Sequence, residues 1–294
     1  MNHTAQALAD LIIHCHADKG AGPALAAQAH IDRSAVAVSA ALDLALPALG
    51  FEPHDAAILK SAWLRQSQRL GGFEANRWPS NALDFGLHAH PLPFPPCPKN
   101  LGLYAVLPSA DWVARMAAVG VPTLQLRFKS DDRRAIEREV IAAVRAVQGS
   151  TSLLFINDHW ASAIEHGAYG VHLGQEDLRI APIERLRMSG VRLGLSTHGY
   201  AEMLRADAIG PSYLALGAVF PTTLKRMATP PQGLGRLQAY AQLMAHRPLV
   251  GIGGIDASRF ADVRACGVGS VAVVRAIVGE AQAEQAALKL MAAW

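Results

Sequence analysis

One run of the sequence combines a strand pattern with a tight turn and two acids: Gly170-Val171-His172-Leu173-Gly174-Gln175-Glu176-Asp177. Gly174 allows the chain to turn directly after the apolar residues, and the carboxylates of Glu176 and Asp177 follow the turn. In a parallel sheet the functional groups collect in the loops after the strands, because the carboxyl ends of the strands share one edge. The run therefore favours a parallel α/β fold, and similar runs occur on both sides of it.

Seven further β-rich runs alternate with amphipathic helical stretches over the rest of the chain from residue 103. Strands that alternate with crossover helices pair in parallel, and eight such units in about 190 residues predict a closed (β/α)8 TIM barrel. An open doubly wound sheet is the structural alternative on pattern alone. The helical stretches include 131–147, 201–208, 237–245 and 258–266. The other strand runs are 103–107, 123–127, 153–157, 192–196, 213–217, 249–252 and 270–274.

The first third of the chain has a different pattern. Apolar residues recur there at helical spacing, for example Leu8, Leu11 and Ile12, and no strand pattern is evident. The run 90–98 is rich in proline, which fixes its own φ and lacks an amide hydrogen, so we predict a stiff linker. The expected domains are a helical N-terminal extension with a Pro-rich linker, 1–98, of unknown function, and a barrel, 99–294.

Composition and charge limit the partners. The formal net charge of +3 is small and its cationic residues are dispersed, so we expect no nucleic-acid binding. Cys15, Cys97 and Cys266 are odd in number and far apart, which favours a reduced, cytoplasmic location over a disulfide framework. No secretory signal and no apolar run long enough to span a bilayer are evident, so we expect no membrane partner. The sequence leaves a homo-oligomer open.

The second strand run ends in three polar residues on one face. Because side chains alternate along a strand, Gln125, Arg127 and Lys129 point to one side while Leu126 and Phe128 point to the other. An unpaired cation in a barrel mouth costs several kcal/mol, so an anionic ligand is the simplest explanation. A solvated strand end with scattered charge is the alternative.

Carboxylates follow the third and fourth strand runs. Asn157 and Asp158 end the third run, and Asp177 follows the fourth. Loops after neighbouring strands meet at one edge, so we expect both Asp side chains to converge near Arg127 and Lys129. Mg²⁺ prefers one or two carboxylates together with substrate phosphates, so the sequence predicts a magnesium site formed by the two acids. The alternative is that each Asp caps the helix after its strand.

The later loops are rich in hydroxyls and glycine. Ser196 ends the fifth run, and Thr222 and Lys225 follow the sixth. Gly254 lies in the glycine-rich turn after the seventh run, where backbone amides can approach a phosphate, as is common after strands seven and eight of such barrels. We therefore expect a phosphate group at this side of the mouth.

From about residue 103 to residue 292, the successive motifs together resemble those of thiamine-phosphate synthases, and the residues 172–177 are the most specific part. That family is a (β/α)8 barrel that joins an aminopyrimidine methyl diphosphate to a thiazole phosphate and releases pyrophosphate with Mg²⁺. The motifs that carry the resemblance are Leu103-Tyr104, Gln125-Leu126-Arg127-Phe128-Lys129, Asn157-Asp158, the opening run, Gly194-Leu195-Ser196-Thr197-His198, Val219-Phe220-Pro221-Thr222 with Lys225, and Ile252-Gly253-Gly254-Ile255.

The resemblance implies a role for individual residues. Arg127, Lys129 and Lys225 would stabilise the departing pyrophosphate, and Asp158 and Asp177 would hold Mg²⁺. The thiazole nitrogen would then capture a pyrimidine carbocation, so no general base is required for the bond-forming step. The implied substrate-binding residues are Gln125, Arg127, Lys129, Asn157, Ser196, Thr222, Lys225, Gly254, the backbone at Val274, and Arg275.

Three positions depart from the family pattern. Phe128 stands where that pattern has Glu, Leu224 where it has a second Thr, and Arg275 where a Ser is usual. Leu224 removes a hydroxyl from the thiazole-phosphate site, and we hypothesise that the Arg275 guanidinium replaces it, because guanidinium pairs well with phosphate.

Histidines receive no catalytic role in this interpretation. We expect His172 and His198 to be hydrogen-bonded structural residues. His14, Cys15 and His16 are not expected to form a metal cluster, because consecutive positions of a helix point in different directions.

Two other functions remain open at this level. One is a thiazole tautomerase of the same superfamily, against which the two Asp residues argue. The other is a noncatalytic binding or regulatory barrel. Residues 34–70 resemble the closing helices of hydroxymethylpyrimidine phosphate kinases but are too short for a kinase domain, so we expect a vestigial or docking role.

Overall fold

The computed structural model describes residues 3–19, 34–223 and 229–294. Eight parallel strands form a closed barrel in chain order, and β1 closes the ring by pairing with β8, with Gly102 opposite Ser270. The TIM-barrel prediction is therefore correct, and the open doubly wound sheet is excluded. The strands are β1 (Gly102–Leu107), β2 (Thr123–Leu126), β3 (Leu153–Asn157), β4 (Gly170–Leu173), β5 (Arg192–Thr197), β6 (Tyr213–Leu216), β7 (Leu249–Ile252) and β8 (Ser270–Val273).

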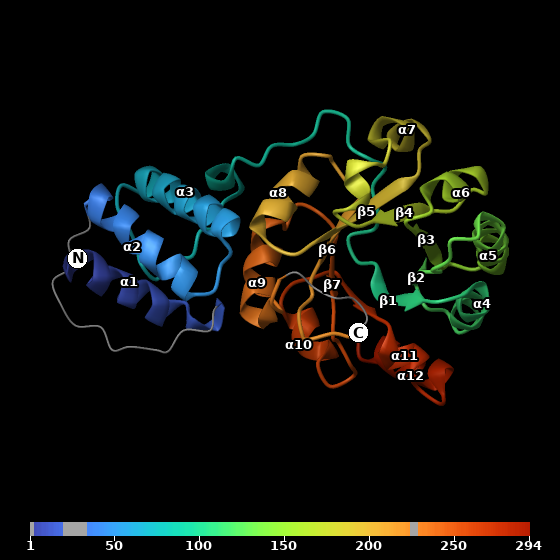
Figure 1. Cartoon of the computed structure of the whole chain (residues 1–294). Helices are drawn as coiled ribbons and strands as arrows, with labels where there is room; N and C mark the ends of the chain where they lie inside the picture. The colour runs from blue at the N-terminus through green and yellow to red at the C-terminus, as the bar shows by residue number, and fades with distance from the viewer. Residues whose placement is uncertain (1–2, 20–33, 224–228) are drawn as a thin grey trace.

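Helices surround the ring, as Figure 1 shows, and they begin close to where the amphipathic pattern predicts. No helix in the described part of the chain is long and apolar enough to cross a membrane. The helices of the barrel are α4 (Ala110–Ala118), α5 (Arg133–Ala146), α6 (Trp160–Glu165), the short η3 (Asp177–Arg179), α7 (Ile183–Met188), α8 (Tyr200–Asp207), α9 (Gly233–Leu243), α10 (Phe260–Ala265), α11 (Arg275–Val278) and α12 (Ala283–Ala292).

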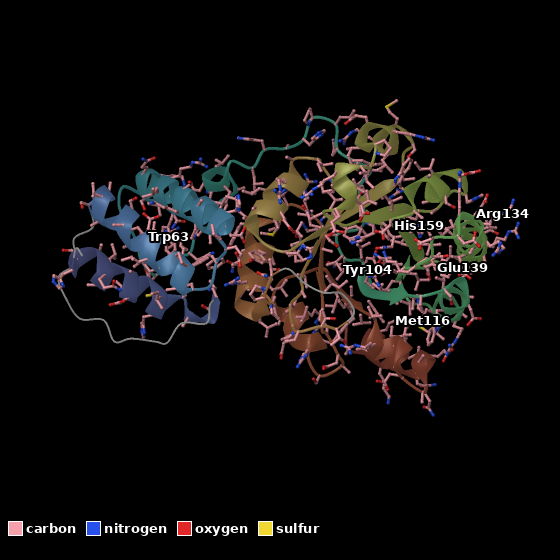
Figure 2. The ribbon with its side chains drawn as sticks, viewed as in Figure 1. Trp63, Tyr104, Met116, Arg134, Glu139 and His159 are labelled. Atoms are coloured by element: carbon pink, nitrogen blue, oxygen red, sulfur yellow. The ribbon has the colours of Figure 1, made fainter. Side chains whose placement is uncertain are left out.

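Alternation along the strands separates two hydrophobic cores. On β1, Leu103, Ala105 and Leu107 face the helices, while Tyr104 and Val106 face the inside of the barrel. The interior is unusually aromatic, because the Tyr104, Phe155 and Tyr213 rings meet there. Figure 2 shows Tyr104 within the ring of strands. A barrel interior filled by side chains is a packed core rather than a channel, so ligands have access only at its ends.

Three helices precede the barrel and pack against one another: α1 (His3–Cys15), α2 (Ala35–Ala48) and α3 (Pro53–Leu70), with the short turns η1 (Ala17–Lys19) and η2 (Ala82–Phe85). The helical extension expected from the apolar spacing is therefore present, and it lies beside α8 and α9 (Figure 1). Its buried residues join those around the barrel in one continuous hydrophobic core. Figure 2 shows Trp63 at the centre of these helices.

Polar contacts also join the extension to the barrel. Trp78 Nε1 donates to the Tyr200 hydroxyl at 2.9 Å. Asp55, in the first turn of α3, accepts hydrogen bonds from the backbone amides of Tyr200 at 3.1 Å and Ala201 at 2.8 Å. Arg236 of α9 donates to the carbonyl of Leu49 at 2.8 Å. The extension is therefore bonded to the outside of the barrel at several points.

The proline-rich run 90–98 has neither helix nor strand, as its composition predicts. It is nevertheless in contact with the barrel along part of its length. Phe94 is buried and its amide donates to the Gly210 carbonyl at 2.8 Å, while Ser212 Oγ donates to the Pro95 carbonyl at 2.6 Å. These contacts lie near the amino end of β6, so the linker crosses the end of the barrel opposite to the loops that follow the strands.

Three neighbouring residues at the end of α1, His14, Cys15 and His16, differ in how deeply they are buried. His14 is exposed, Cys15 is half-buried and His16 is buried, so their side chains diverge as helical spacing requires. His16 Nε2 lies 2.9 Å from the Ala75 carbonyl oxygen, and its ring packs edge-on against Trp63 and Trp78. Desolvation by burial lowers the pKa of His16 from its ordinary 6.5 to about 4.

Candidate active site

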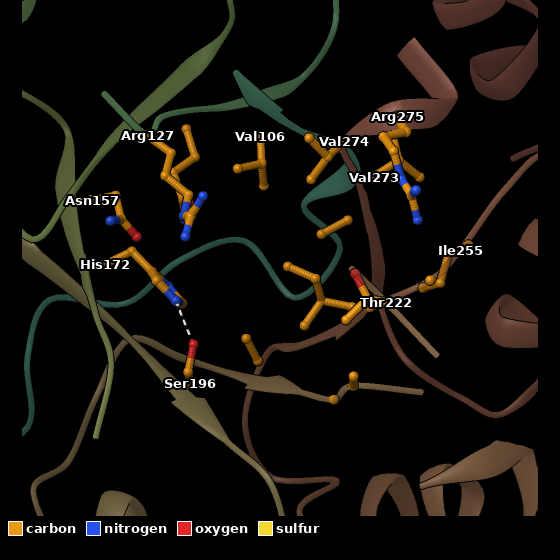
Figure 3. Close-up of a pocket in the computed structure, with 18 of the residues that line it drawn as sticks. Val106, Arg127, Asn157, His172, Ser196, Thr222, Ile255, Val273, Val274 and Arg275 are labelled. Atoms are coloured by element: carbon orange, nitrogen blue, oxygen red, sulfur yellow. Dashed lines mark hydrogen bonds between the residues drawn. The ribbon is translucent and has the colours of Figure 1, made fainter. Parts of the chain in front are cut away.

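A cavity of about 690 Å³ opens among the loops that follow the strands. It is the end of the barrel where enzymes of this fold carry out chemistry. Lys225 and Leu224 lie outside the described residues. All the other residues that the sequence nominates line the cavity, and Figure 3 labels several of them: Gln125, Arg127, Lys129, Asn157, Asp158, Asp177, Ser196, Thr222, Gly254, Val274 and Arg275.

Cationic and acidic side chains meet at one side of the mouth. Lys129 Nζ forms an ion pair with Asp158 Oδ2 at 2.5 Å, and the Arg127 side chain points into the same cavity (Figure 3). The loops are held together, because His159 Nε2 bonds the Phe128 carbonyl at 3.1 Å and so connects the loop after β2 to the loop after β3. The convergence that the sequence predicts is therefore present in the structure.

The backbone at Asp158 is in an uncommon conformation. Its φ is +62°, in the left-handed region that residues other than glycine seldom adopt. Strain of this kind costs on the order of 1–3 kcal/mol and is concentrated at functional sites. Its amide donates to the His172 carbonyl at 3.0 Å, which fixes the turn as the chain leaves β3. The strained turn directs the carboxylate toward Lys129 instead of toward the helix that follows.

The second carboxylate lies close to the first. Asp177 Oδ2 accepts a hydrogen bond from the Gly174 amide at 2.9 Å. Burial raises the pKa of Asp177, the Gly174 amide opposes this, and the negative charge of Asp158 raises the pKa further. The alternative, in which each Asp caps the helix after its strand, is not observed, because α6 and η3 have no side-chain cap. Two carboxylates that repel each other beside phosphate-sized space fit the ligand set that Mg²⁺ prefers.

Polar groups also form the floor of the cavity. Ser196 Oγ lies 2.8 Å from His172 Nε2, as the dashed line in Figure 3 shows. Gln125 is nearly buried, and its Nε2 donates to the Tyr104 hydroxyl at 3.0 Å. His172 is hydrogen-bonded, as expected, but it also lines the cavity, which the sequence argument missed.

The opposite side of the mouth combines glycine backbone with hydroxyls and guanidinium groups. Gly254 has a φ of +66°, and a β-carbon there would overlap the loop at Pro221, so the position admits only glycine. Arg275 Nη1 donates to Thr223 Oγ1 at 3.2 Å (Figure 3 labels Arg275 and Thr222). Amides, hydroxyls and a guanidinium within reach of one another are suited to a phosphate group.

One cation of this side was not predicted. Arg259 lines the cavity, donates to the Gly254 carbonyl at 2.9 Å and lies over the Phe220 ring at 4.6 Å. It follows β7 by several residues, where nothing in the local sequence separates it from the other surface arginines.

His198 also faces the cavity, and its Nδ1 lies 2.6 Å from Glu202 Oε2. Burial alone would raise the pKa of Glu202, but the hydrogen bond and charge of His198 lower the pKa below its usual range. His198 is therefore a hydrogen-bonded residue, as expected.

The fold and the cavity define the class of protein: a (β/α)8 barrel with a cavity lined by cationic, acidic and glycine-rich groups at the carboxyl end of its strands. Comparison with known proteins identifies the family within this class. Residues 103–277 match the model of the family described as thiamine monophosphate synthase, and the chain belongs to this family.

The relatives agree with that assignment. Thiamine-phosphate synthase of Neisseria meningitidis serogroup B is 49% identical over 201 residues, which cover 68% of this chain and 98% of that protein. The protein of the same name from Escherichia coli O6:H1 is 48% identical over 198 residues, covering 67% of this chain and 94% of that protein. A solved structure, thiamine phosphate pyrophosphorylase from Pyrococcus furiosus, has a TM-score of 0.58 at 28% identity and covers 66% of this chain and 96% of that one.

Proposed function

We propose that the barrel condenses 4-amino-2-methyl-5-(diphosphomethyl)pyrimidine with a thiazole phosphate through a pyrimidine carbocation, using Mg²⁺ and the cavity residues in the roles given below. Membership of the family makes the chain a transferase that forms thiamine phosphate and releases pyrophosphate. The tautomerase and the noncatalytic barrel are not favoured, because the relatives carry the synthase name.

A single observation carries the assignment of roles: Lys129 and Asp158 are paired at 2.5 Å in the cavity that Arg127 and Asp177 also line. A diphosphate needs cations for its oxygens and carboxylates for the metal that it shares, and both are present at this one place. In the proposal, Arg127 and Lys129 bind the diphosphate and Asn157 assists. The same role is expected of Lys225, which is not among the described residues.

Leaving-group stabilisation follows from this arrangement. When the carbon–oxygen bond to pyrophosphate breaks, negative charge grows on the departing oxygens, and in this proposal Arg127 and Lys129, which line the same cavity, stabilise that charge. Mg²⁺, held by Asp158 and Asp177, would supply further neutralisation of that charge. Because the thiazole nitrogen has its own electron pair, the bond that then forms to the carbocation needs no general base.

The second substrate occupies the other side of the mouth in this proposal. Thr222, the Gly254 amide and the backbone at Val274 bind the thiazole phosphate, and Arg275 provides a charged donor. Its existing bond to Thr223 Oγ1 holds the guanidinium on this side of the cavity. Ser196 and Gln125, on the floor, contact the pyrimidine. The three cysteines are free, which suits the cytoplasmic location that we propose.

A pyrophosphate-release assay with both substrates tests the proposal. The wild-type chain should release pyrophosphate only when both substrates and Mg²⁺ are present. Arg127→Gln should lower kcat/KM by roughly a hundredfold, since it removes a charged donor to the leaving group. Arg134→Gln, an exposed position on α5 outside the cavity, is the matched control and should retain activity. Release that is unaffected by a chelator, or by Arg127→Gln, would contradict the proposal.

Calorimetry separates binding from turnover. The pyrimidine diphosphate should bind tightly with Mg²⁺ and weakly without it, and thiazole phosphate alone should show no such dependence. If the barrel bound the diphosphate equally well without metal, the proposal that Asp158 and Asp177 hold Mg²⁺ would be wrong.

A further inference from the structure

Five side chains form an unbroken line of hydrogen bonds through the interior of the barrel. Gln125 Nε2 donates to Tyr104 OH at 3.0 Å, and Tyr104 OH lies 2.7 Å from Tyr213 OH. Tyr213 OH lies 2.7 Å from His172 Nδ1, and His172 Nε2 lies 2.8 Å from Ser196 Oγ. These residues come from β2, β1, β6, β4 and β5, so the line joins opposite walls of the barrel.

Three members of this line face the cavity and two do not. Gln125, His172 and Ser196 line the cavity, whereas the two tyrosines are buried beneath it. Burial raises the pKa of Tyr104 and of Tyr213 far above the usual range, so each hydroxyl keeps its proton. The tyrosines are therefore placed to connect the two ends without touching a ligand.

Proton counting gives the line a direction. Each phenol has one proton to donate and two lone pairs that can accept. Tyr104 accepts from Gln125, and a buried hydroxyl proton without an acceptor is costly, so Tyr104 donates to Tyr213 and Tyr213 in turn donates to His172 Nδ1. A neutral imidazole that accepts at Nδ1 carries its proton on Nε2 and donates it to Ser196 Oγ. Ser196 then accepts from within the protein and has its own proton available for a ligand.

The other end presents an acceptor. Gln125 Nε2 donates one of its two hydrogens to Tyr104, and this bond fixes the amide so that its carbonyl oxygen is the group that accepts from a ligand. The floor thus offers an acceptor at Gln125 and a donor at Ser196. An aminopyrimidine offers the complement, an exocyclic amine that donates and a ring nitrogen that accepts. In a 4-oxo pyrimidine the exocyclic oxygen accepts and a ring nitrogen carries a proton, so the donor and acceptor positions are exchanged. To match that ring, every hydrogen bond of the line would have to reverse its direction, which requires the other imidazole tautomer of His172 and a rotated Gln125 amide.

We propose that the line from Gln125 through Tyr104, Tyr213 and His172 to Ser196 fixes the donor and acceptor polarity of the pyrimidine subsite, so that Tyr213 and His172 determine specificity for a 4-amino over a 4-oxo ring. The inference rests on the proposed function. Tyr213 is a positioning residue, because it does not line the cavity and acts through the residues bonded to it on either side.

The packing around Tyr213 indicates that this position is built for the ring. A β-carbon at Gly194 would overlap the Tyr213 ring, so the glycine in β5 makes room for it. The ring also stacks on His172 with a centroid distance of 5.7 Å and meets Tyr104 edge-on. Substituting Phe for Tyr213 therefore preserves the packed shape and removes only the hydroxyl that links the two halves of the line.

Kinetic discrimination tests the inference. The ratio of kcat/KM for the 4-amino substrate to that for its 4-oxo analogue should fall about tenfold in Tyr213→Phe, the effect of one lost hydrogen bond. The KM for thiazole phosphate should change less than about twofold. Tyr240→Phe is the matched control, because it removes a buried hydroxyl that donates to Gln232 outside the barrel interior, and its ratio should match wild type. An unchanged ratio in Tyr213→Phe would overturn the inference even though the wild type is active.

A spectroscopic measurement gives an independent answer that needs no turnover. ¹⁵N shifts of the His172 ring, assigned by comparison with His172→Gln, should show a proton on Nε2 and none on Nδ1 in the ligand-free wild-type chain. A proton on Nδ1 would refute the proposed polarity. If the wild type instead released no pyrophosphate, the proposed function would fail, and the ring shifts would still decide the direction of the line.

Discussion

Replacing Asp55 tests whether the N-terminal extension stabilises the barrel at the catalytic end. The Asp55 carboxylate accepts hydrogen bonds from the first two amides of α8, those of Tyr200 and Ala201. The loop before Tyr200 also approaches it closely, because a β-carbon at Gly199 would overlap the carboxylate. Asp55 therefore caps a helix that lies 145 residues away in the sequence.

The magnitude follows from those two bonds. Loss of a capping side chain costs about 1 kcal/mol, and a backbone donor left buried without a partner costs roughly 1–3 kcal/mol. Tyr200 is fully buried, whereas Ala201 is partly exposed and can bond to water instead. We therefore expect Asp55→Ala to lower the free energy of unfolding by about 2 kcal/mol. Asp55→Asn retains one acceptor and should lower it by about half as much.

Urea unfolding at neutral pH measures the effect. Asp43→Ala is the control within the same extension, because Asp43 pairs with Lys60 at 2.6 Å on the exposed surface and should contribute no more than about 0.5 kcal/mol. One continuous hydrophobic core spans the extension and the barrel, so a single transition is expected. If Asp55→Ala were as stable as Asp43→Ala, the extension would not stabilise α8 through this carboxylate.

Three further predictions concern other parts of the molecule. Arg275→Ala should raise the KM for thiazole phosphate far more than the KM for the pyrimidine diphosphate, and equal effects in steady-state kinetics would refute the phosphate role of Arg275. Asp177→Asn should raise the Mg²⁺ concentration needed for half-maximal activity at least tenfold, whereas Glu280→Gln, which is also at the cavity, should leave that concentration unchanged. If both variants needed the same Mg²⁺ concentration, Asp177 would not be a ligand of the metal. The pKa of His16 is about 4 in the folded chain and ordinarily 6.5, so the unfolded chain binds a proton at a higher pH than the folded chain does. The free energy of unfolding should therefore fall by about 2 kcal/mol between pH 7 and pH 5. His16→Gln should lose that part of the pH dependence in urea titrations.

The spacing of apolar residues predicts the barrel, because each strand and each helix has a characteristic periodicity within its own residues. The predicted run 123–127 ends one residue beyond β2, since Arg127 no longer pairs as a strand residue although its amide still donates to the Leu107 carbonyl at 2.7 Å. Alternation correctly directed Gln125 into the barrel and Leu126 out of it. Where the conformation depends on residues that are close together in the sequence, the sequence alone is sufficient to predict it.

Contacts between distant segments could not be predicted in this way. Tyr104 and Tyr213 look like ordinary apolar strand residues, and only the closed ring brings their hydroxyls together. The role of Asp55 is equally hidden, because an acid in the first turn of a helix is expected to stabilise its own helix. One local sign was available: glycine inside a strand, as at Gly194, indicates close approach by another group. The docking or vestigial role expected for residues 34–70 stays a prediction.

The position of the extension also restricts how copies of this chain can associate. Its helices occupy the outer surface of α8 and α9, where Trp78, Phe51 and Tyr200 pack together. A barrel without such a segment would leave that apolar surface open to a neighbour, but here the same polypeptide covers it. A second copy therefore cannot pack directly on the apolar surface of α8 and α9, and would meet the extension or another part of the ring instead.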